Sequence, residues 1–311
     1  MNESFFHGGN AIAVAKALGV EVKSLLDLSA SMNPFAPNVE SIVRKNIDYI
    51  NYYPNPTQAT NEISRIMGIS HEEILLTNGG SEAIALVASQ LEGAYIKEPE
   101  FSLYKRHLYA TDSCLPRWRS NPNNPLGHLA NDEEEALVWD EAFFPLATGN
   151  WTRGDISRGS IVIGSLTKIF SCPGLRIGYI MSKDRFLLEK IARRQPQWAV
   201  NSLALAAIPE LLSLTDLRAW SEGISILKEQ LKEILLSYGL YPLDTDANWL
   251  LIPNATWIIK PLFERGILVR DCTNFGLDGV IRMAVPNESG LGRLDEAFSE
   301  IESSIGIEKF L

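Results

Sequence analysis

The segment SLTK at residues 165–168, followed by PGLRIGY at residues 173–179, decides how the chain is interpreted. Lys168 comes directly after an apolar run that we expect to be a buried strand, and α/β proteins bind ligands at the carboxyl ends of such strands. A lysine amine there can form an imine with an aldehyde, while the Ser165 hydroxyl and the Arg176 guanidinium can bind a phosphate. A single lysine in this position would usually be a surface residue of a turn, but the complete string favours a binding site.

Short apolar runs alternate with amphipathic stretches on both sides of this segment. We expect strands at residues 74–77, 94–97, 136–139, 160–164 and 177–182, and helices at residues 81–91, 101–110 and 183–194. Such alternation is typical of βα units around a largely parallel sheet, so the predicted fold class is α/β.

The pattern changes after Pro209. We expect a long amphipathic helix at residues 215–235 and strands at residues 248–252, 267–270 and 279–284. These elements predict a small α+β C-terminal domain. We therefore divide the chain into an N-terminal arm at residues 1–40 that packs with the small domain, a large domain at residues 41–212 and the small domain at residues 213–311.

Composition excludes several classes of protein. The net charge of −10 argues against nucleic-acid binding, because counterion release rewards basic surfaces. The three cysteines, Cys114, Cys172 and Cys272, are too scattered for a disulfide framework or a metal site. Neither a signal peptide nor a membrane span is visible, so we expect a cytoplasmic protein with no membrane partner.

Asp140 is a second candidate site residue, because it ends the apolar run before EAF at residues 141–143. A carboxylate in this position can face the pyridine nitrogen of pyridoxal phosphate (PLP) and keep the ring protonated, which makes it a better electron sink. Capping of the following helix is an equally good explanation of Asp140 when this segment is taken alone.

Three further segments can belong to the same site. Gly80 and Ser81 lie in a turn between a predicted strand and helix, where backbone N–H groups can bind a phosphate, although many such turns are glycine-rich. The loop NPNNPLG at residues 121–127 can hold an amide donor, or it is simply a turn. Arg282 is a charge within an apolar strand and needs a partner such as a substrate carboxylate, unless it faces solvent from an edge strand.

In this order, from His7 to about Ala284, the segments resemble the fold-type-I PLP enzymes of the class I/II aminotransferase superfamily. The resemblance implies a mostly parallel sheet of the seven-stranded type, with Lys168 binding PLP as a Schiff base and Asp140 facing the pyridine nitrogen. The other cofactor contacts that it implies are Asn124 at the 3′-oxygen, Phe101 stacked on the ring, and Gly80, Ser81, Ser165 and Arg176 at the phosphate. Tyr53 resembles a tyrosine that reaches the phosphate of the neighbouring subunit, which implies a homodimer with shared active sites.

Four motifs are more similar to the threonine-phosphate decarboxylases than to the histidinol-phosphate aminotransferases. They are HGGN at residues 7–10, DLSASMNP at 27–34, QWAVN at 197–201 and ILVRDCTNFGL at 267–277. Phe143 also fits, because the aminotransferases usually carry a tyrosine there. This resemblance implies a phosphorylated amino acid as substrate, bound by His7, Asn33, Arg270 and Arg282, with His7 and Asn33 at its phosphate and Arg282 at its carboxylate. His7 in an exposed tail and Asn33 in a simple turn are the alternatives.

The implied reaction is decarboxylation of O-phospho-L-threonine to an aminopropanol phosphate in cobalamin biosynthesis. The alternatives are a histidinol-phosphate-type aminotransferase, a phosphoserine decarboxylase and a PLP-fold binding protein that has lost catalysis.

The sequence departs from the family pattern at one edge of the large domain. Nineteen residues separate Phe101 from Asn121, fewer than the family usually has, so we expect a strand and a helix to be missing. Glu100 stands just before Phe101, and Leu126 replaces a common threonine. These differences are the ones that favour an inactive protein.

Overall fold

The computed structural model describes residues 9–305, which fall into two compact units. One unit contains residues up to 35, the short segment 125–127 and residues from 222 onward; the other contains residues 36–124 and 128–221. The domain boundaries after residues 40 and 212 stay a prediction.

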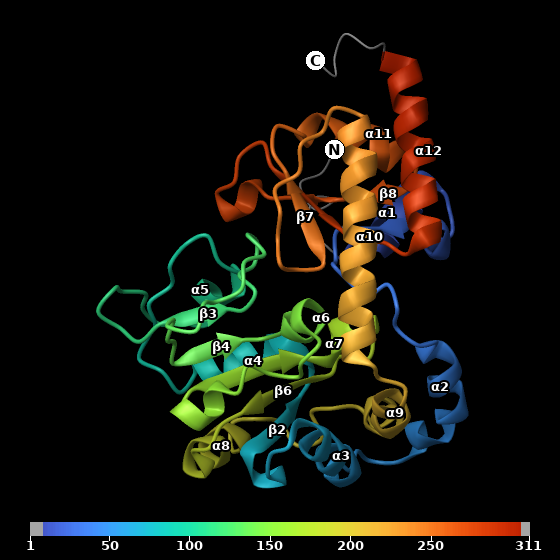
Figure 1. The fold of residues 1–311 in the computed structure, drawn as a ribbon. Coiled ribbons are helices and arrows are strands. Elements are labelled where there is room, and N and C mark those ends of the chain that lie inside the picture. Colours follow the sequence, from blue (N-terminus) through green and yellow to red (C-terminus); the bar gives the residue numbers. More distant parts are fainter. Residues whose placement is uncertain (1–8, 306–311) are drawn as a thin grey trace. The chain divides into compact units, whose positions relative to one another are not determined.

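The unit formed by residues 36–124 and 128–221 is built on a five-stranded sheet (Figure 1). The strand order is β2 (Ile74–Thr77), β6 (Gly178–Met181), β5 (Ile161–Ser165), β4 (Val138–Asp140) and β3 (Trp118–Ser120). Only β6 runs against the others, since β3, β4 and β5 pair in parallel and β6 is antiparallel to both β5 and β2. The α/β fold class with a mostly parallel, shortened sheet is thus confirmed.

Helices connect and cover these strands. They are α2 (Val39–Lys45), α3 (Thr57–Met67), α4 (Gly79–Ala88), α5 (Leu103–His107), α6 (Phe144–Thr148), α7 (Leu166–Ile169), α8 (Arg185–Ala192) and α9 (Ser202–Ser213), with short 3₁₀ turns at Ile47–Asn51, His71–Glu73 and Asp155–Arg158. Side-chain caps fix where three of them begin: Asn38 accepts from Ser41 N, Asp184 from Leu187 N and Asn201 from Ala204 N. The strands are almost wholly buried, which explains their continuous apolar runs.

The other unit joins the N-terminal segment to the C-terminal third of the chain. Its elements are α1 (Ala11–Leu18), β1 (Leu26–Asp27), most of α10 (Leu217–Ser237), β7 (Trp249–Ile252), α11 (Ile259–Glu264), β8 (Ile267–Leu268), β9 (Arg270–Asp271), β10 (Ile281–Ala284) and α12 (Glu288–Ile305), with 3₁₀ turns at Val22–Ser24, Thr256–Ile258 and Thr273–Phe275. β1 pairs in parallel with β8, and β10 lies between β7 and β9 in an antiparallel sheet.

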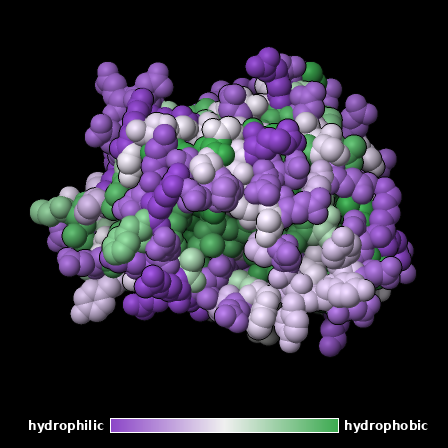
Figure 2. All heavy atoms as spheres, turned by 90° about the horizontal axis from the view of Figure 1, so that it is seen from below, coloured by the Kyte–Doolittle hydropathy of each residue, from purple (hydrophilic) through white to green (hydrophobic). Residues whose placement is uncertain are grey.

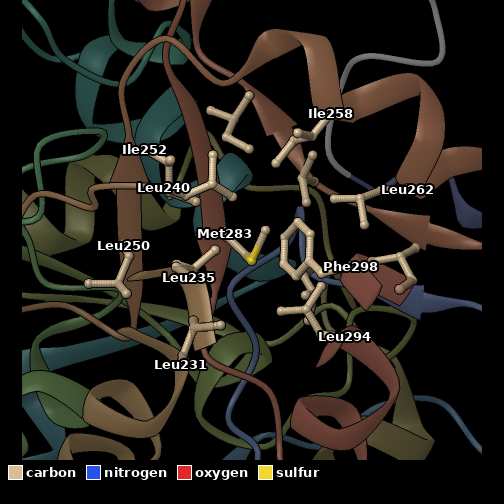
Figure 3. Packing of buried hydrophobic residues seen from close by; sticks show 14 of the residues in the cluster. Leu231, Leu235, Leu240, Leu250, Ile252, Ile258, Leu262, Met283, Leu294 and Phe298 are labelled. Atoms are coloured by element: carbon tan, nitrogen blue, oxygen red, sulfur yellow. The ribbon is translucent and has the colours of Figure 1, made fainter. Parts of the chain in front are cut away.

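The core of this unit lies where α10, α12 and the sheet meet (Figure 3). Leu231 and Leu235 of α10, Met283 of β10 and Phe298 of α12 are all fully buried in one apolar cluster. Leu231 and Leu235 are four residues apart on one face of α10, and this 3.6-residue period predicted α10, whereas α12 was missed.

One expected strand is absent, and one edge strand was not expected. Residues 94–97 form no strand: only Tyr95 pairs, in an isolated bridge with Arg117, because the neighbouring Ala94 N–H is donated to Ala110 O (3.1 Å) instead. The edge strand β3 was missed, since its three residues, Trp118–Ser120, are too few to show a period.

Charged and polar side chains cover most of the face shown in Figure 2, with a smaller group of apolar side chains between them. Of the helices that the structure describes, none has the length and apolar character needed to cross a membrane.

Phe298 tests the importance of the apolar cluster. Replacing it with alanine is expected to lower the free energy of unfolding by about 3–5 kcal/mol, because the fully buried ring would leave a cavity. Phe186→Ala is the control, since Phe186 is 66% exposed. Urea unfolding measures both; an equal loss of stability in the two variants would contradict the cluster's role.

Candidate active site

Lys168 lies where the sequence placed it, just after the carboxyl end of a buried parallel strand. Ser165 ends β5, and Lys168 belongs to the short helix α7 that follows. The turn is held by backbone hydrogen bonds from Leu166 and Thr167 to Ile177 O (3.1 and 3.3 Å). The amine is half-buried, with Nζ 5.5 Å from the centre of the buried Phe143 ring.

A polar concave turn lies close to Ser165. Gly79 has φ +77°, and a Cβ added to it would lie 2.5 Å from Arg176 Nη2, so only glycine lets the guanidinium approach this closely. A Cβ on Gly80 would lie 3.6 Å from Ser165 Cβ. The structure therefore brings Gly80, Ser165 and Arg176 together.

The N-terminus of α4 opens into this turn. Asn78, which precedes the helix, makes no side-chain cap to it, so the first N–H groups of the ten-residue helix have no cap there. Ser81 is exposed in its first turn. Backbone N–H groups, two hydroxyls and a guanidinium at a helix N-terminus form an arrangement that suits a phosphate.

Asp140 ends β4, the strand next to β5, and pairs in register with Ile163. Its carboxylate is buried and accepts hydrogen bonds from Tyr104 Oη (2.8 Å, at Oδ2) and Ala142 N (3.0 Å, at Oδ1). Burial raises the pKa of Asp140, and the two hydrogen bonds oppose that shift. A buried carboxylate of this kind is best stabilised by a facing cation, such as a protonated pyridine.

The asparagine loop begins at the end of β3, next to Asp140. Asn121 N donates to Asp140 O (2.8 Å), and Asn124 N donates to Ser120 Oγ (2.8 Å). Asn124 is buried, and Phe101 is half-buried with its ring edge against Tyr104, 5.8 Å between centroids.

Two residues at this site were not singled out for it by the sequence. Tyr104, the hydrogen-bond donor to Asp140, has no sequence signal of its own, because it lies in the five-residue helix α5 and Phe101 precedes that helix. Glu100 was noted only as a departure, yet it is buried and accepts a hydrogen bond from Ser120 N (3.0 Å). Burial raises the pKa of Glu100 to about 7.

The predicted substrate residues belong to the other unit. Arg282 and Arg270 are both buried and are paired residues on β10 and β9. Because β10 is the central strand, the solvent-facing alternative for Arg282 is wrong. The Arg282 guanidinium lies 4.8 Å from the centre of the Trp249 ring, and burial lowers its pKa to about 10. Arg270 Nη2 donates to Asn274 Oδ1 (2.9 Å).

Three other predicted residues have simpler surroundings. Asn33 is buried, and its Oδ1 accepts from Phe35 N (2.9 Å), which is the local turn that was its alternative explanation. Tyr53 is 78% exposed and packs on Trp198, with 4.5 Å between ring centroids. His7 lies outside the described residues.

The site residues in the unit formed by residues 36–124 and 128–221 fit PLP. Asp140 ends β4, and Lys168 follows the neighbouring strand β5. The turn that can bind a phosphate lies at the start of α4, beside the start of β6. The close approach of Arg176 to Gly79 and the buried, hydrogen-bonded Asp140 are the observations on which this fit rests.

Comparisons with known proteins agree with this arrangement. The family described as aminotransferase class I and II matches residues 118–298. The threonine-phosphate decarboxylase of Salmonella typhimurium is 30% identical over 95% of this chain and 97% of its own length, and a histidinol-phosphate aminotransferase of Methanococcoides burtonii is 25% identical over 93% of each. The solved histidinol-phosphate aminotransferase of Sinorhizobium meliloti, in complex with pyridoxal-5′-phosphate, matches with a TM-score of 0.82 at 18% identity, covering 95% of both chains. The last likeness concerns the fold alone.

Gly178 is expected to be essential to the phosphate-binding turn. A Cβ at this position would lie 2.5 Å from Gly79 C, so Gly178→Ala must displace the backbone of the turn. We expect PLP affinity to fall about tenfold or more, because overpacking of this kind costs about 1–3 kcal/mol. Titration with PLP, followed by absorbance, measures the change. Gly174→Ala is the control, since a Cβ there meets nothing within 4 Å; equal PLP affinity of the two variants would contradict the prediction.

Glu141 is expected to make stability depend on pH. It is fully buried, and burial raises its pKa from 4.5 to about 7. The folded state then binds the proton more tightly than the unfolded state, so the stability associated with Glu141 is present below pH 4.5 and is lost as the pH rises through 7. Glu141→Gln should therefore gain in melting temperature over the native protein as the pH rises from about 5 to 8. Exposed Glu133→Gln is the control; a difference that does not change with pH would contradict the prediction.

Proposed function

Because the chain belongs to the class I and II aminotransferase family, and is a PLP-dependent enzyme, we propose that it decarboxylates O-phospho-L-threonine to an aminopropanol phosphate for the side chain of cobalamin. The observation that supports a decarboxylase most directly is Phe143, whose ring centre lies 5.5 Å from Lys168 Nζ. Aminotransferases of this family usually place a tyrosine there, and a phenyl ring cannot donate a hydrogen bond to the cofactor. The 30% identity to a threonine-phosphate decarboxylase over nearly the whole chain agrees with this choice.

In this proposal, the residues at the β4–β5–β6 edge and at the start of α4 have separate roles in binding the cofactor. Gly80, Ser81, Ser165 and Arg176 bind the cofactor phosphate; Lys168 holds the cofactor through its amine, and Asp140 holds a proton at the pyridine nitrogen. When bound, PLP draws electrons from whichever Cα bond of the substrate stands perpendicular to its ring. Lys168 Nζ then delivers a proton to Cα after CO₂ has left.

Binding groups at the two ends of the substrate decide which bond is perpendicular. We assign the substrate carboxylate to Arg282 and the substrate phosphate to His7 and Asn33, with Arg270 assisting. Two buried guanidiniums on paired strands repel one another, so an anion between them is favourable. Holding the carboxylate perpendicular selects CO₂ loss, whereas holding Cα–H perpendicular near Lys168 selects transamination.

The proposed active enzyme is a homodimer in which Tyr53 reaches the cofactor phosphate of the neighbouring subunit. Tyr53 and the neighbouring Trp198 are 78% and 56% exposed, and together they form an aromatic pair on the surface that a second copy could cover.

A histidinol-phosphate-type aminotransferase is the second candidate, because relatives such as the Methanococcoides burtonii protein match over the same length. Phosphoserine is a further possible substrate, since one methyl group in a pocket changes binding by only about 1–3 kcal/mol.

The decisive experiment incubates the PLP-loaded protein with O-phospho-L-threonine while CO₂ and the visible spectrum are followed together. We expect CO₂ release with the starting spectrum restored. Lys168→Ala should lose at least about a thousandfold in rate, because a positioned acid–base group alone contributes about 10²–10⁴; exposed Lys183→Ala is the control.

Each other result contradicts the proposal in its own way. Conversion to the pyridoxamine form without CO₂ would make the protein an aminotransferase. Failure to develop a visible band with PLP would favour an inactive binding protein.

A further inference from the structure

Glu100 is a second buried carboxyl group close to Asp140. Its side chain accepts hydrogen bonds from Ser120, at the backbone N–H (3.0 Å) and at the hydroxyl, and only 4% of the residue is exposed. The Asp140 charge adds to the effect of burial in raising the pKa of Glu100, so the two carboxyls interact electrostatically. An acidic residue is seldom buried this completely without a specific partner.

Ser120 links Glu100 to the asparagine loop. While its hydroxyl donates to Glu100, its oxygen accepts from Asn124 N (2.8 Å). The loop is held at a second point, where Asn123 Nδ2 donates to Pro99 O (3.1 Å). Hydrogen bonds therefore join the two short segments 98–101 and 120–124.

Tyr104 links the same group to Asp140. Its hydroxyl donates to Asp140 Oδ2 (2.8 Å). The charges of Asp140 and Glu100, together with burial, raise the pKa of Tyr104, while a hydrogen bond with Ser120 opposes them. Glu100, Ser120, Tyr104 and Asp140 thus form one buried polar network.

Charged groups on the neighbouring elements are engaged elsewhere. From β3, Arg119 forms an ion pair with Glu134. From α5, Lys105 pairs with the exposed Glu98 (2.5 Å), whose carboxylate also accepts from Glu100 N (2.9 Å). Asp140 on β4 and Tyr104 on α5 are the titratable groups that act on the network with Glu100.

We propose that Glu100 is a positioning residue of the cofactor site, which acts through Ser120 on Asn124 and through Tyr104 on Asp140 and sets how readily the bound cofactor loses a proton. This rests on the cofactor contacts proposed above for Asn124 and Asp140, and it does not depend on the substrate. An ionised Glu100 adds negative charge beside Asp140 and so favours the protonated form of the cofactor. Because burial raises the pKa of Glu100 to about 7, its charge is present mainly above that pH.

The test uses the PLP-loaded protein without substrate and follows its visible absorption as the pH is raised. Glu100→Gln keeps the shape of the side chain and an acceptor for Ser120 N but removes the charge. We expect the midpoint of the spectral change to fall by roughly one pH unit, the effect of a unit charge about 10 Å away at an effective dielectric constant of about 20.

Glu98→Gln is the matched control, since it makes the same chemical change two residues away on the surface, and its midpoint should stay within about 0.2 units of the native one. If Glu100 only fastens the two segments together, Glu100→Gln will leave the midpoint unchanged, and the proposal is overturned. Should that variant not bind PLP, Ser120→Ala takes its place. It removes the hydroxyl hydrogen bond that favours the ionised form of Glu100, so Glu100 keeps its proton to a higher pH and the midpoint should fall here too; an unmoved midpoint overturns the proposal equally. Because no substrate is used, neither result depends on whether the enzyme is a decarboxylase.

Discussion

The close approach of Gly178 to Gly79 and Gly80 is the constraint on which the site depends. β6 and the start of α4 come so near that a Cβ at 178 would lie 2.5 Å from Gly79 C and 2.7 Å from Gly80 N. This contact brings the uncapped N–H groups of α4 alongside β5, the neighbour of β6, so that Ser165 and Arg176 reach the same turn. Lys168 follows Ser165 by three residues, so its amine lies close to the turn that can bind a phosphate.

Most of the elements around Lys168 could be predicted from the sequence, because they show a clear hydrophobic pattern or contain glycine at a turn. The strands around Lys168 are buried on both faces and appear as apolar runs. The helix α10 packs by one face, and its 3.6-residue period predicted it. Asp140 and Arg176 could be named because their order along the chain resembles a known family. Tyr104, Glu100 and Ser120 could not, since their role comes from contacts between segments with no periodic pattern, and the three-residue strand β3 escaped for the same reason.

The buried acids of the large sheet show how the site distributes charge. Asp140 and Glu141 are adjacent, yet they differ in surroundings: Asp140 has two hydrogen-bond donors, Tyr104 and Ala142, whereas Glu141 accepts from Arg153 N (3.2 Å) at one oxygen and its other oxygen, Oε2, has no hydrogen-bond partner in the described structure. Burial raises the pKa of both, so neither charge is well compensated by the protein alone. A protonated pyridine ring would supply the missing positive charge at Asp140. Glu141 can instead hold a proton, because its pKa lies at about 7.

A third buried acid, Glu100, lies near the β3 edge of the sheet. With nineteen residues between Phe101 and Asn121, the chain returns from α5 to β3 without adding another strand of the sheet, and Tyr95 is left with a single bridge. Hydrogen bonds join the segments that carry Phe101 and Asn124: Ser120 N donates to Glu100, and Asn123 Nδ2 donates to Pro99 O. The first of these contacts involves an ionisable group, whereas the second does not depend on pH. This contact places an ionisable group within the network of Asp140, where under our proposal its charge acts on the chemistry of the site as well as on its shape.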